Sequence, residues 1–364
     1  MDLVLYHPLH GYYPSPREKI GSHGDYYTSP GVHPVFGRLI ARQLQQMWKI
    51  LDRPSPFSLV EMGAGQGVLC LHILESCRGM FPSFYKALRY ALVEKSGAYL
   101  EKQKDLLAEF AAAGKVEWRN PDFPLAREEI ITGCILSNEL IDAFPVHRVQ
   151  REGGELMEIY VTFRQGQFAE IPGPLSNPLL AEYLRLYGLP LEEGQRAEVN
   201  LKALEWIEGV SGILERGFVL TVDYGFEAEE LYHPSRRDGT LLGYCGHRVS
   251  ADPFAHIGAQ DLTAHVNFSA LIKRGEALGL RKVGYTEQYK FLIALGLLQE
   301  LEEYEKSSAQ IAVVDFLKNK LAMKNFLIPG GMGSLFKVLA QSKGVGPVDL
   351  LGFRPPLPPT DVYP

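Results

Sequence analysis

The segment Glu61-Met-Gly63-Ala-Gly65-Gln-Gly67 places three evenly spaced glycines between an apolar run and an amphipathic pattern. The run 57–62 has the length and apolar character of a buried strand, and 68–77 repeats apolar residues with helical spacing. Glycine permits a sharp turn and lets a ligand lie against bare backbone, while the first turn of a helix offers unpaired N–H groups. The segment therefore predicts a ligand-binding loop between a strand and a helix.

Strands and helices alternate on both sides of this loop. We expect strands at 57–62, 90–94, 116–118, 133–137 and 218–223, and helices at 34–51, 68–77, 98–113 and 201–215. This alternation predicts a parallel sheet covered by helices on both faces. Later strands at 281–285 and 334–341 flank helices at 291–304 and 308–322. Two late strands, the last inserted antiparallel, favour the class I methyltransferase fold, a Rossmann-like α/β sheet of seven strands. A nicotinamide-binding domain more often ends its sheet on another parallel strand.

Two insertions interrupt the predicted core, one after the fourth strand and one after the fifth. The expected parts are a turn-rich and helical N-terminal segment at 1–50, a core at 51–148, 201–225 and 261–345, an insertion at 149–200, a loop insertion at 226–260 and a proline-rich tail at 346–364. Alternating residues at 157–163 predict a β-hairpin with a strand that begins at Phe168. Loops as long as 226–260 inside a compact domain tend to be functional.

Composition limits the classes of partner and compartment. The 364 residues carry a formal charge of −6, so no global basic field draws in nucleic acid. The four cysteines lack metal-ligand spacing, which indicates free thiols in a reducing compartment and no metal. No segment has the apolar length of a membrane span, and the N-terminal residues lack a secretory n-region. We therefore expect a cytoplasmic protein without membrane insertion.

The spacing of the glycines and the position of Glu61 bear on the ligand of the loop. The pattern is GxGxG, without the extra residue of the GxGxxG loops that seat a pyrophosphate. Glu61 directly precedes the loop, where a carboxylate repels a pyrophosphate but attracts the cationic methionine part of S-adenosylmethionine. Glu94, at the end of the second strand, can accept both hydroxyls of a ribose, or it is an ordinary surface acid. We expect S-adenosylmethionine as cofactor, bound by Glu61, Gly63, Gly65, Gly67, Glu94 and Asn138, with NAD or a ligand-free turn as alternatives.

Polar residues directly follow the fourth strand, where an open α/β sheet faces its ligand crevice. Asn138 can offer its amide to the methionine end of the cofactor. If the chain turns helical at Glu139, the spacing places Glu139 and Asp142 on one helix face. Two such carboxylates could hold a guanidinium group, align it for methylation and accept its proton. We therefore predict Glu139, Asp142 and Asn138 as catalytic; alternatively, Asp142 caps a helix and Glu139 is solvated.

Short motifs are distributed along nearly the whole chain. They are Leu5-Tyr-His-Pro8, Gly11-Tyr-Tyr13, Gly24-Asp-Tyr26, Thr28-Ser-Pro30, Phe36-Gly37, the glycine loop, Ser137-Asn-Glu-Leu-Ile-Asp-Ala-Phe-Pro145, Asp223-Tyr-Gly225, Gly239-Thr-Leu241 with Tyr244, His247-Arg-Val249, Asp261-Leu-Thr-Ala-His-Val-Asn267 and Met332-Gly-Ser-Leu-Phe-Lys337. In these motifs the chain closely resembles the MidA-like methyltransferases. The resemblance implies a class I fold, S-adenosylmethionine as methyl donor, and a protein arginine as acceptor with symmetric dimethylation. Mitochondrial members of this family are assembly factors of respiratory complex I.

Other functions and other residue roles stay open beside this resemblance. The chain could be a cofactor-binding assembly factor without catalysis, or a methyltransferase of small molecules. Asp261 looks like a helix N-cap, and His265 could line an acceptor pocket or satisfy a hydrogen bond in the core. The basic residues of the second insertion could recognise an acidic stretch of a partner protein or form a solvated loop; they are Arg236, Arg237, His247 and Arg248.

Overall fold

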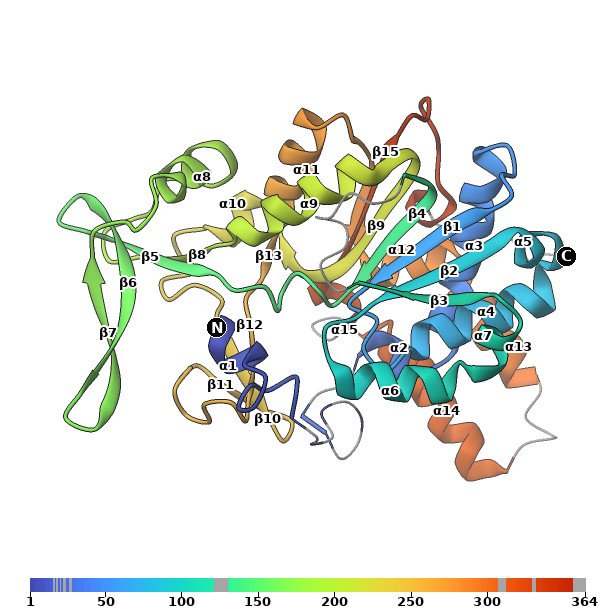
Figure 1. The fold of residues 1–364 in the computed structure, drawn as a ribbon, viewed down its shortest axis with the longest axis horizontal. Helices are drawn as coiled ribbons and strands as arrows, with labels where there is room; N and C mark the ends of the chain where they lie inside the picture. The colour runs from blue at the N-terminus through green and yellow to red at the C-terminus, as the bar shows by residue number, and fades with distance from the viewer. Residues whose placement is uncertain are drawn as a thin grey trace, which may run out of the picture. The chain divides into compact units, whose positions relative to one another are not determined.

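The computed structural model describes residues 1–15, 17, 19, 21, 24, 25, 28–120, 130–306, 312–328 and 332–355. The chain divides into two units. The sheet unit comprises Tyr27–Asn138, Val210–Asp223 and Leu280–Pro364. The second unit comprises Met1–Tyr26, Glu139–Gly209 and Tyr224–Gly279. Figure 1 labels most helices and strands of both.

A mostly parallel sheet forms the core of the sheet unit. Its strands follow the order β14-β15-β9-β4-β1-β2-β3. Their bounds are β1 Phe57–Met62, β2 Leu88–Val93, β3 Val116–Arg119, β4 Ile131–Asn138, β9 Leu214–Phe226, β14 Arg281–Glu287 and β15 Phe336–Lys343. The pairs β1–β2, β1–β4, β2–β3 and β4–β9 are parallel, whereas β14 and β15 are antiparallel. This arrangement confirms the predicted α/β class of fold.

The sheet has one strand more than the seven predicted. In the described part of the chain it contains eight strands, and the additional one is β13, Val266–Asn267. β13 pairs in parallel with Gly225 and Phe226, at the end of β9. A strand of two residues is too short to show the alternation by which strands are predicted from sequence.

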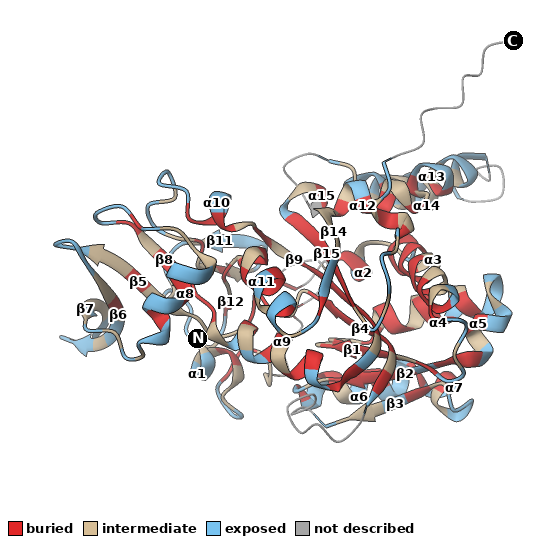
Figure 2. Ribbon diagram, turned by 90° about the horizontal axis from the view of Figure 1, so that it is seen from above, coloured by how far each residue is buried: buried red, intermediate tan, exposed pale blue. Residues whose placement is uncertain are grey.

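Helices surround the strands of the sheet unit. They are α2 Ser29–Val32, α3 Val35–Ile50, α4 Val68–Met80, α5 Pro82–Ala87, α6 Gly97–Leu106, α7 Ala108–Ala112, α12 Gln288–Ala294, α13 Leu297–Lys306, α14 Val313–Asn325, α15 Met332–Leu335 and the 3₁₀ helix Leu351–Phe353. β1, β2 and β4 consist almost wholly of buried residues, as Figure 2 shows in red. Continuous apolar runs are typical of strands that helices cover on both faces.

Two small antiparallel sheets organise the second unit. One has the order β7-β6-β5-β8 and the other β11-β10-β12. The strands are β5 His147–Glu152, β6 Glu155–Arg164, β7 Gln167–Gly173, β8 Arg196–Val199, β10 Leu242–Cys245, β11 Arg248–Ser250 and β12 Asp261–Thr263, and the helices are α1 Asp2–Tyr6, α8 Leu179–Tyr187, α10 Ala228–Leu231 and α11 Phe268–Ala277. Helix α9, Leu201–Ile213, begins in this unit and ends in the sheet unit.

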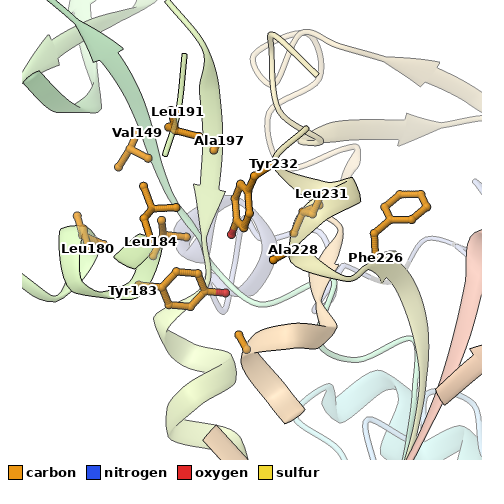
Figure 3. Packing of buried hydrophobic residues seen from close by; sticks show 12 residues of the cluster. Val149, Leu180, Tyr183, Leu184, Leu191, Ala197, Phe226, Ala228, Leu231 and Tyr232 are labelled. Atoms are coloured by element: carbon orange, nitrogen blue, oxygen red, sulfur yellow. The ribbon is translucent and has the colours of Figure 1, made fainter. Parts of the chain in front are cut away.

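The core of the second unit is a buried cluster around α8, β8 and α10. Leu180, Tyr183 and Leu184 of α8 pack with Ala197 of β8 and with Tyr232, which follows α10 (Figure 3). These contacts join the stretch 149–200 to the stretch 226–260. Both insertions therefore contribute to one hydrophobic core.

Several predicted segments differ from the structure. Asp261 lies in β12 and is not a helix N-cap, so that prediction is wrong. The next helix, α11, begins seven residues later, at Phe268, and its N-cap is Asn267, whose side chain accepts a hydrogen bond from the Ala270 N–H. The predicted loop 226–260 contains α10, β10 and β11. The hairpin predicted at 157–163 is present as β6 and β7.

Parts of some predicted segments lie outside the described residues. These parts are the beginning of the helix 308–322 and the tail beyond residue 355. Within the described residues, no helix is both long enough and apolar enough to cross a membrane.

Candidate functional site

The glycine loop joins β1 to α4 through three residues in the left-handed backbone region. Gly63, Gly65 and Gly67 have φ angles of 72°, 53° and 80°. A Cβ atom at Gly67 would lie 3.1 Å from Gln103 Cγ, whereas a Cβ atom at Gly65 would meet no heavy atom within 4 Å. Left-handed φ angles favour glycine at all three positions. The free space at Gly65 leaves room for a ligand beside its Cα atom.

Gln103, on α6, fixes the shape of this loop. Its Nε2 donates a hydrogen bond of 2.7 Å to the carbonyl oxygen of Gly65, and its Oε1 accepts one of 3.0 Å from Trp118 Nε1. The side chain is fully buried. Sequence analysis missed Gln103, because nothing in a helical pattern distinguishes it from an exposed glutamine.

Glu94 follows β2 and binds the same loop. Its two carboxylate oxygens accept hydrogen bonds of 2.8 Å from the N–H groups of Gly65 and Ser96. Burial raises the pKa of Glu94, and these backbone hydrogen bonds oppose the rise. A carboxylate offers about four acceptor positions, so Glu94 retains capacity for the hydroxyls of a ribose.

Glu61 is a buried carboxyl group on β1, 3% exposed. The hydroxyl of Tyr90, on the neighbouring β2, donates to it a hydrogen bond of 2.7 Å. Burial raises the pKa of Glu61 to about 8, although the Tyr90 hydrogen bond opposes the shift. A buried acid without a cationic partner favours its neutral form, and a cation placed beside it would reverse that preference.

Asn138 ends β4, next to β1 in the sheet. Its neighbour Ser137 is in register with Met62, so Asn138 lies at the same edge of the sheet as the glycine loop. Asn138 is buried. The carboxyl ends of three adjacent parallel strands thus present Glu61, Glu94 and Asn138. A buried acid for a cation, an acid for a ribose and a glycine loop with free space beside Gly65 fit S-adenosylmethionine.

The stretch after β4 differs from its prediction. Glu139 has a φ angle of 53°, and residues 139–146 form bends and a turn instead of a helix. The expectation that Glu139 and Asp142 share a helix face is therefore wrong, and no helix begins there for Asp142 to cap. A non-glycine residue with left-handed backbone costs roughly 1–3 kcal/mol, and such residues concentrate at functional sites.

Asp142 and a second acid, Asp261, are both buried in the second unit. The carbonyl oxygen of Asp142 accepts a hydrogen bond of 3.0 Å from the N–H of Ala264. Tyr244 is in register with Asp261 across β10 and β12. Burial and then the charges of Asp142 and Asp261 raise the pKa of Tyr244, so both carboxylates act electrostatically on this tyrosine.

Two N-terminal tyrosines complete this group. The hydroxyl of Tyr13 donates a hydrogen bond of 3.0 Å to Asp261 Oδ1, and that of Tyr6 donates one of 3.0 Å to the carbonyl oxygen of Ala143. The rings of Tyr6 and Tyr13 stack with centroids 5.3 Å apart. We call Asp142, Asp261, Tyr13 and Tyr244 the acid–tyrosine cluster. Sequence analysis did not identify the two tyrosines as site residues.

His265 and the arginines of the second insertion make contacts inside the second unit. Burial and then the charge of Arg236 lower the pKa of His265 to about 4, so its imidazole is neutral at pH 7. The guanidinium of Arg236 lies over the ring of Phe226, 4.4 Å from its centroid. Arg237 donates a hydrogen bond of 2.7 Å to the carbonyl oxygen of Glu193. Both arginines thus have intramolecular roles.

The strand order, the antiparallel last strand and the glycine loop together define a methyltransferase of class I fold. Residues 39–286 match the model of a family of S-adenosyl-L-methionine-dependent methyltransferases. The chain belongs to this family, it is a methyltransferase, and S-adenosylmethionine is its cofactor.

Known relatives extend over most of the chain. The mitochondrial protein arginine methyltransferase NDUFAF7 of Homo sapiens is 26% identical over 93% of this chain and 78% of its own length. The homolog from Drosophila melanogaster is 26% identical over 95% of this chain and 80% of its own. A crystal structure from Burkholderia thailandensis, bound to S-adenosyl-homocysteine, matches with 31% identity and a TM-score of 0.84, over 96% of this chain and 88% of that one.

These relatives decide two of the expectations from sequence. The cofactor is S-adenosylmethionine, so the nicotinamide alternative is excluded. The expected cytoplasmic location is wrong by the same comparison, because the curated relatives are mitochondrial proteins.

Proposed function

We propose that this methyltransferase modifies arginine side chains of a protein. The observation that carries the proposal is the acid–tyrosine cluster. In it, the buried Asp261 accepts a hydrogen bond from Tyr13 and is in register with Tyr244, and the charge of the buried Asp142 acts on Tyr244. A guanidinium is a planar cation with five N–H donors, and it binds carboxylates and aromatic rings better than an ammonium does. The names of the relatives, which are protein arginine methyltransferases, support the same acceptor.

The cofactor is held in this proposal by residues of the sheet unit. Glu61 faces the cationic part of the cofactor, Glu94 accepts from its ribose hydroxyls, and Asn138 binds its methionine end. Gly63, Gly65 and Gly67 let the cofactor approach the loop backbone. When bound, S-adenosylmethionine supplies the methyl group.

In this proposal, the residues that follow β4 and the acid–tyrosine cluster bind and activate the arginine that accepts the methyl group. The lone pairs of a guanidinium are delocalised, so its nitrogen is a poor nucleophile until nearby carboxylates concentrate the positive charge on the other nitrogens. The nitrogen that gains a methyl group gives up one proton, which Glu139 or Asp142 accepts. Asn138, Glu139 and Asp142 are thus the proposed catalytic residues, and Asp261 is added as an acceptor-binding residue.

Methyl transfer from labelled cofactor into a cell extract tests this function, with hydrolysis of the labelled protein to identify the modified residue. We expect labelled methylarginine. In assays on an arginine peptide, Asp142→Asn and Asp261→Asn should each raise KM at least tenfold, because the guanidinium loses a charged partner. Asp315→Asn, at an exposed aspartate on α14, is the matched control and should leave KM unchanged.

Other outcomes separate the remaining functions. Label found on a small molecule and absent from protein would contradict the arginine assignment and favour the small-molecule alternative. A Gly65→Val protein that no longer binds cofactor, yet still supports assembly of its partner, would favour the non-catalytic alternative. Symmetric dimethylation and participation in respiratory complex assembly stay predictions from family resemblance.

A further inference from the structure

Glu61 lies just before the glycine loop of the sheet unit and has no balancing cation among the described residues. Glu61 is 3% exposed, and among the described residues it forms no ion pair. Its neighbours in the sheet are Leu92 and Leu136, which are apolar. Ionising an isolated acid in such surroundings is costly, and a nearby acid increases the cost.

In the part of the chain that the structure describes, the side chains that interact with Glu61 are acids or neutral donors. Tyr90, on β2, donates its hydroxyl to Glu61 Oε2 at 2.7 Å. Glu94, after β2, adds a second negative charge, and Cys70, on α4, is a buried thiol whose pKa is raised by burial and by Glu61. The surroundings therefore favour a proton on Glu61 until a cation arrives.

We propose that Glu61 and Tyr90 form a proton-coupled cation subsite, in which binding of S-adenosylmethionine displaces the proton of Glu61 into solvent. Tyr90 is a positioning residue in this subsite. Its hydroxyl fixes the orientation of the carboxyl group and stabilises the carboxylate after the proton has left. The inference rests on the assignment of Glu61 to the cofactor site and is independent of the acceptor.

A shift of the pKa of Glu61 to about 8 agrees with this geometry. Below that pH the free protein carries the proton, and the complex with a cationic ligand does not. Linkage then requires that affinity for the cofactor rise with pH, by up to tenfold per pH unit for one proton released. The cofactor has an α-amino group of its own, and α-amino groups ionise near pH 8. The contribution of Glu61 to proton release is therefore measured as the difference between wild type and Glu61→Gln.

Calorimetry of S-adenosylmethionine binding at pH 7, in phosphate and in Tris, measures the protons released. We expect wild-type protein to release about one proton more than Glu61→Gln. From pH 6 to 7.5, the ratio of the association constants of wild type and Glu61→Gln should rise roughly tenfold per pH unit. Equal proton release by the two proteins, with a ratio that does not depend on pH, would overturn the inference.

Two further arms sharpen the test. S-adenosyl-homocysteine has the amino group but lacks the sulfonium charge. If both ligands release the same number of protons, the cation beside Glu61 is the ammonium group. If S-adenosylmethionine releases more, it is the sulfonium. If neither ligand releases a proton, the proposal is contradicted.

Tyr90→Phe should move the pH dependence of affinity to higher pH, because the carboxylate loses its hydrogen bond. Tyr232→Phe removes a buried hydroxyl that donates to the carbonyl oxygen of Glu198 in the second unit. It is the matched control and should leave the pH dependence of cofactor affinity unchanged. A Tyr90→Phe protein that folds and has the wild-type pH profile would exclude a role for the hydroxyl.

Discussion

Glu139 combines a carboxylate with a backbone conformation that only glycine adopts without cost. It follows β4 directly and has a φ angle of 53°. For an L-residue the left-handed region costs roughly 1–2 kcal/mol, so a protein selected for stability alone would favour glycine there. We therefore infer that the strained backbone is retained because the side chain of Glu139 has a function.

Substitution separates the backbone and the side chain of Glu139. Glu139→Gly should abolish methyl transfer and raise the free energy of unfolding by up to about 1 kcal/mol, because the strain is relieved. Glu139→Gln should also abolish transfer but leave stability unchanged, because the strained backbone remains. Chemical denaturation and methyl transfer assays measure the two effects.

Gln165 is a suitable control, since its φ angle of 52° is nearly that of Glu139. It lies in the turn between β6 and β7. Gln165→Gly should raise stability to a similar degree without loss of methyl transfer. If Glu139→Gly keeps full activity, Glu139 has no catalytic role.

Helix α6 acts on the cofactor site through one side chain. Gln103 binds the carbonyl oxygen of Gly65 and the indole N–H of Trp118 and thereby connects α6, the glycine loop and β3. Gln103→Leu should lower the free energy of unfolding by about 1–3 kcal/mol, because polar groups lose their partner. It should also weaken binding of S-adenosylmethionine, measured by calorimetry.

The control for this variant is Gln299→Leu, at an exposed position on α13. It should change neither stability nor cofactor affinity appreciably. A Gln103→Leu protein with normal cofactor affinity would show that the loop keeps its shape without α6.

At the level of elements, the predictable parts are those with a long local pattern. β1 lies where its apolar run predicts it, at Phe57–Met62, and α3 covers most of the predicted helix 34–51. β10, β11 and β12 were missed, because strands of three or four residues are too short to establish alternation. β10 and β11 form a short local hairpin, and β12 joins it from a segment further along the chain.

The same distinction applies to the candidate site. The glycine loop is a contiguous motif, so its position and its likeness to cofactor loops follow from sequence. The acid–tyrosine cluster joins Tyr13, Asp142, Tyr244 and Asp261 from four distant stretches. A helical turn after β4 was expected from spacing alone, and spacing contains no information about the left-handed backbone of Glu139.

The stability of the whole ligand-free molecule should depend on pH through Glu61. Its folded pKa of about 8 lies above the ordinary value of 4.5. The folded state therefore retains a proton that the unfolded chain has lost. The resulting stabilisation is complete below about pH 4.5 and decreases as the pH rises to 8.

Glu61→Gln should remove this dependence, because glutamine resembles the protonated acid and cannot ionise. Between pH 5 and 8, wild type should lose up to about 1.4 kcal/mol of stability per pH unit relative to the variant. Denaturation of both proteins without cofactor across this range provides the measurement. If the difference in unfolding free energy between wild type and Glu61→Gln does not change with pH, Glu61 has its ordinary pKa in the folded protein.

The order of strands in the large sheet has a consequence for synthesis on the ribosome. β9 ends at Phe226, whereas β15, which lies between β9 and β14, begins only at Phe336. A growing chain therefore carries β9 with one unpaired edge through the translation of all the intervening residues. Open strand edges invite pairing with other chains. Nascent copies of this protein should depend on chaperones, or on slow translation by neighbouring ribosomes, until Phe336–Lys343 has emerged and completed the sheet.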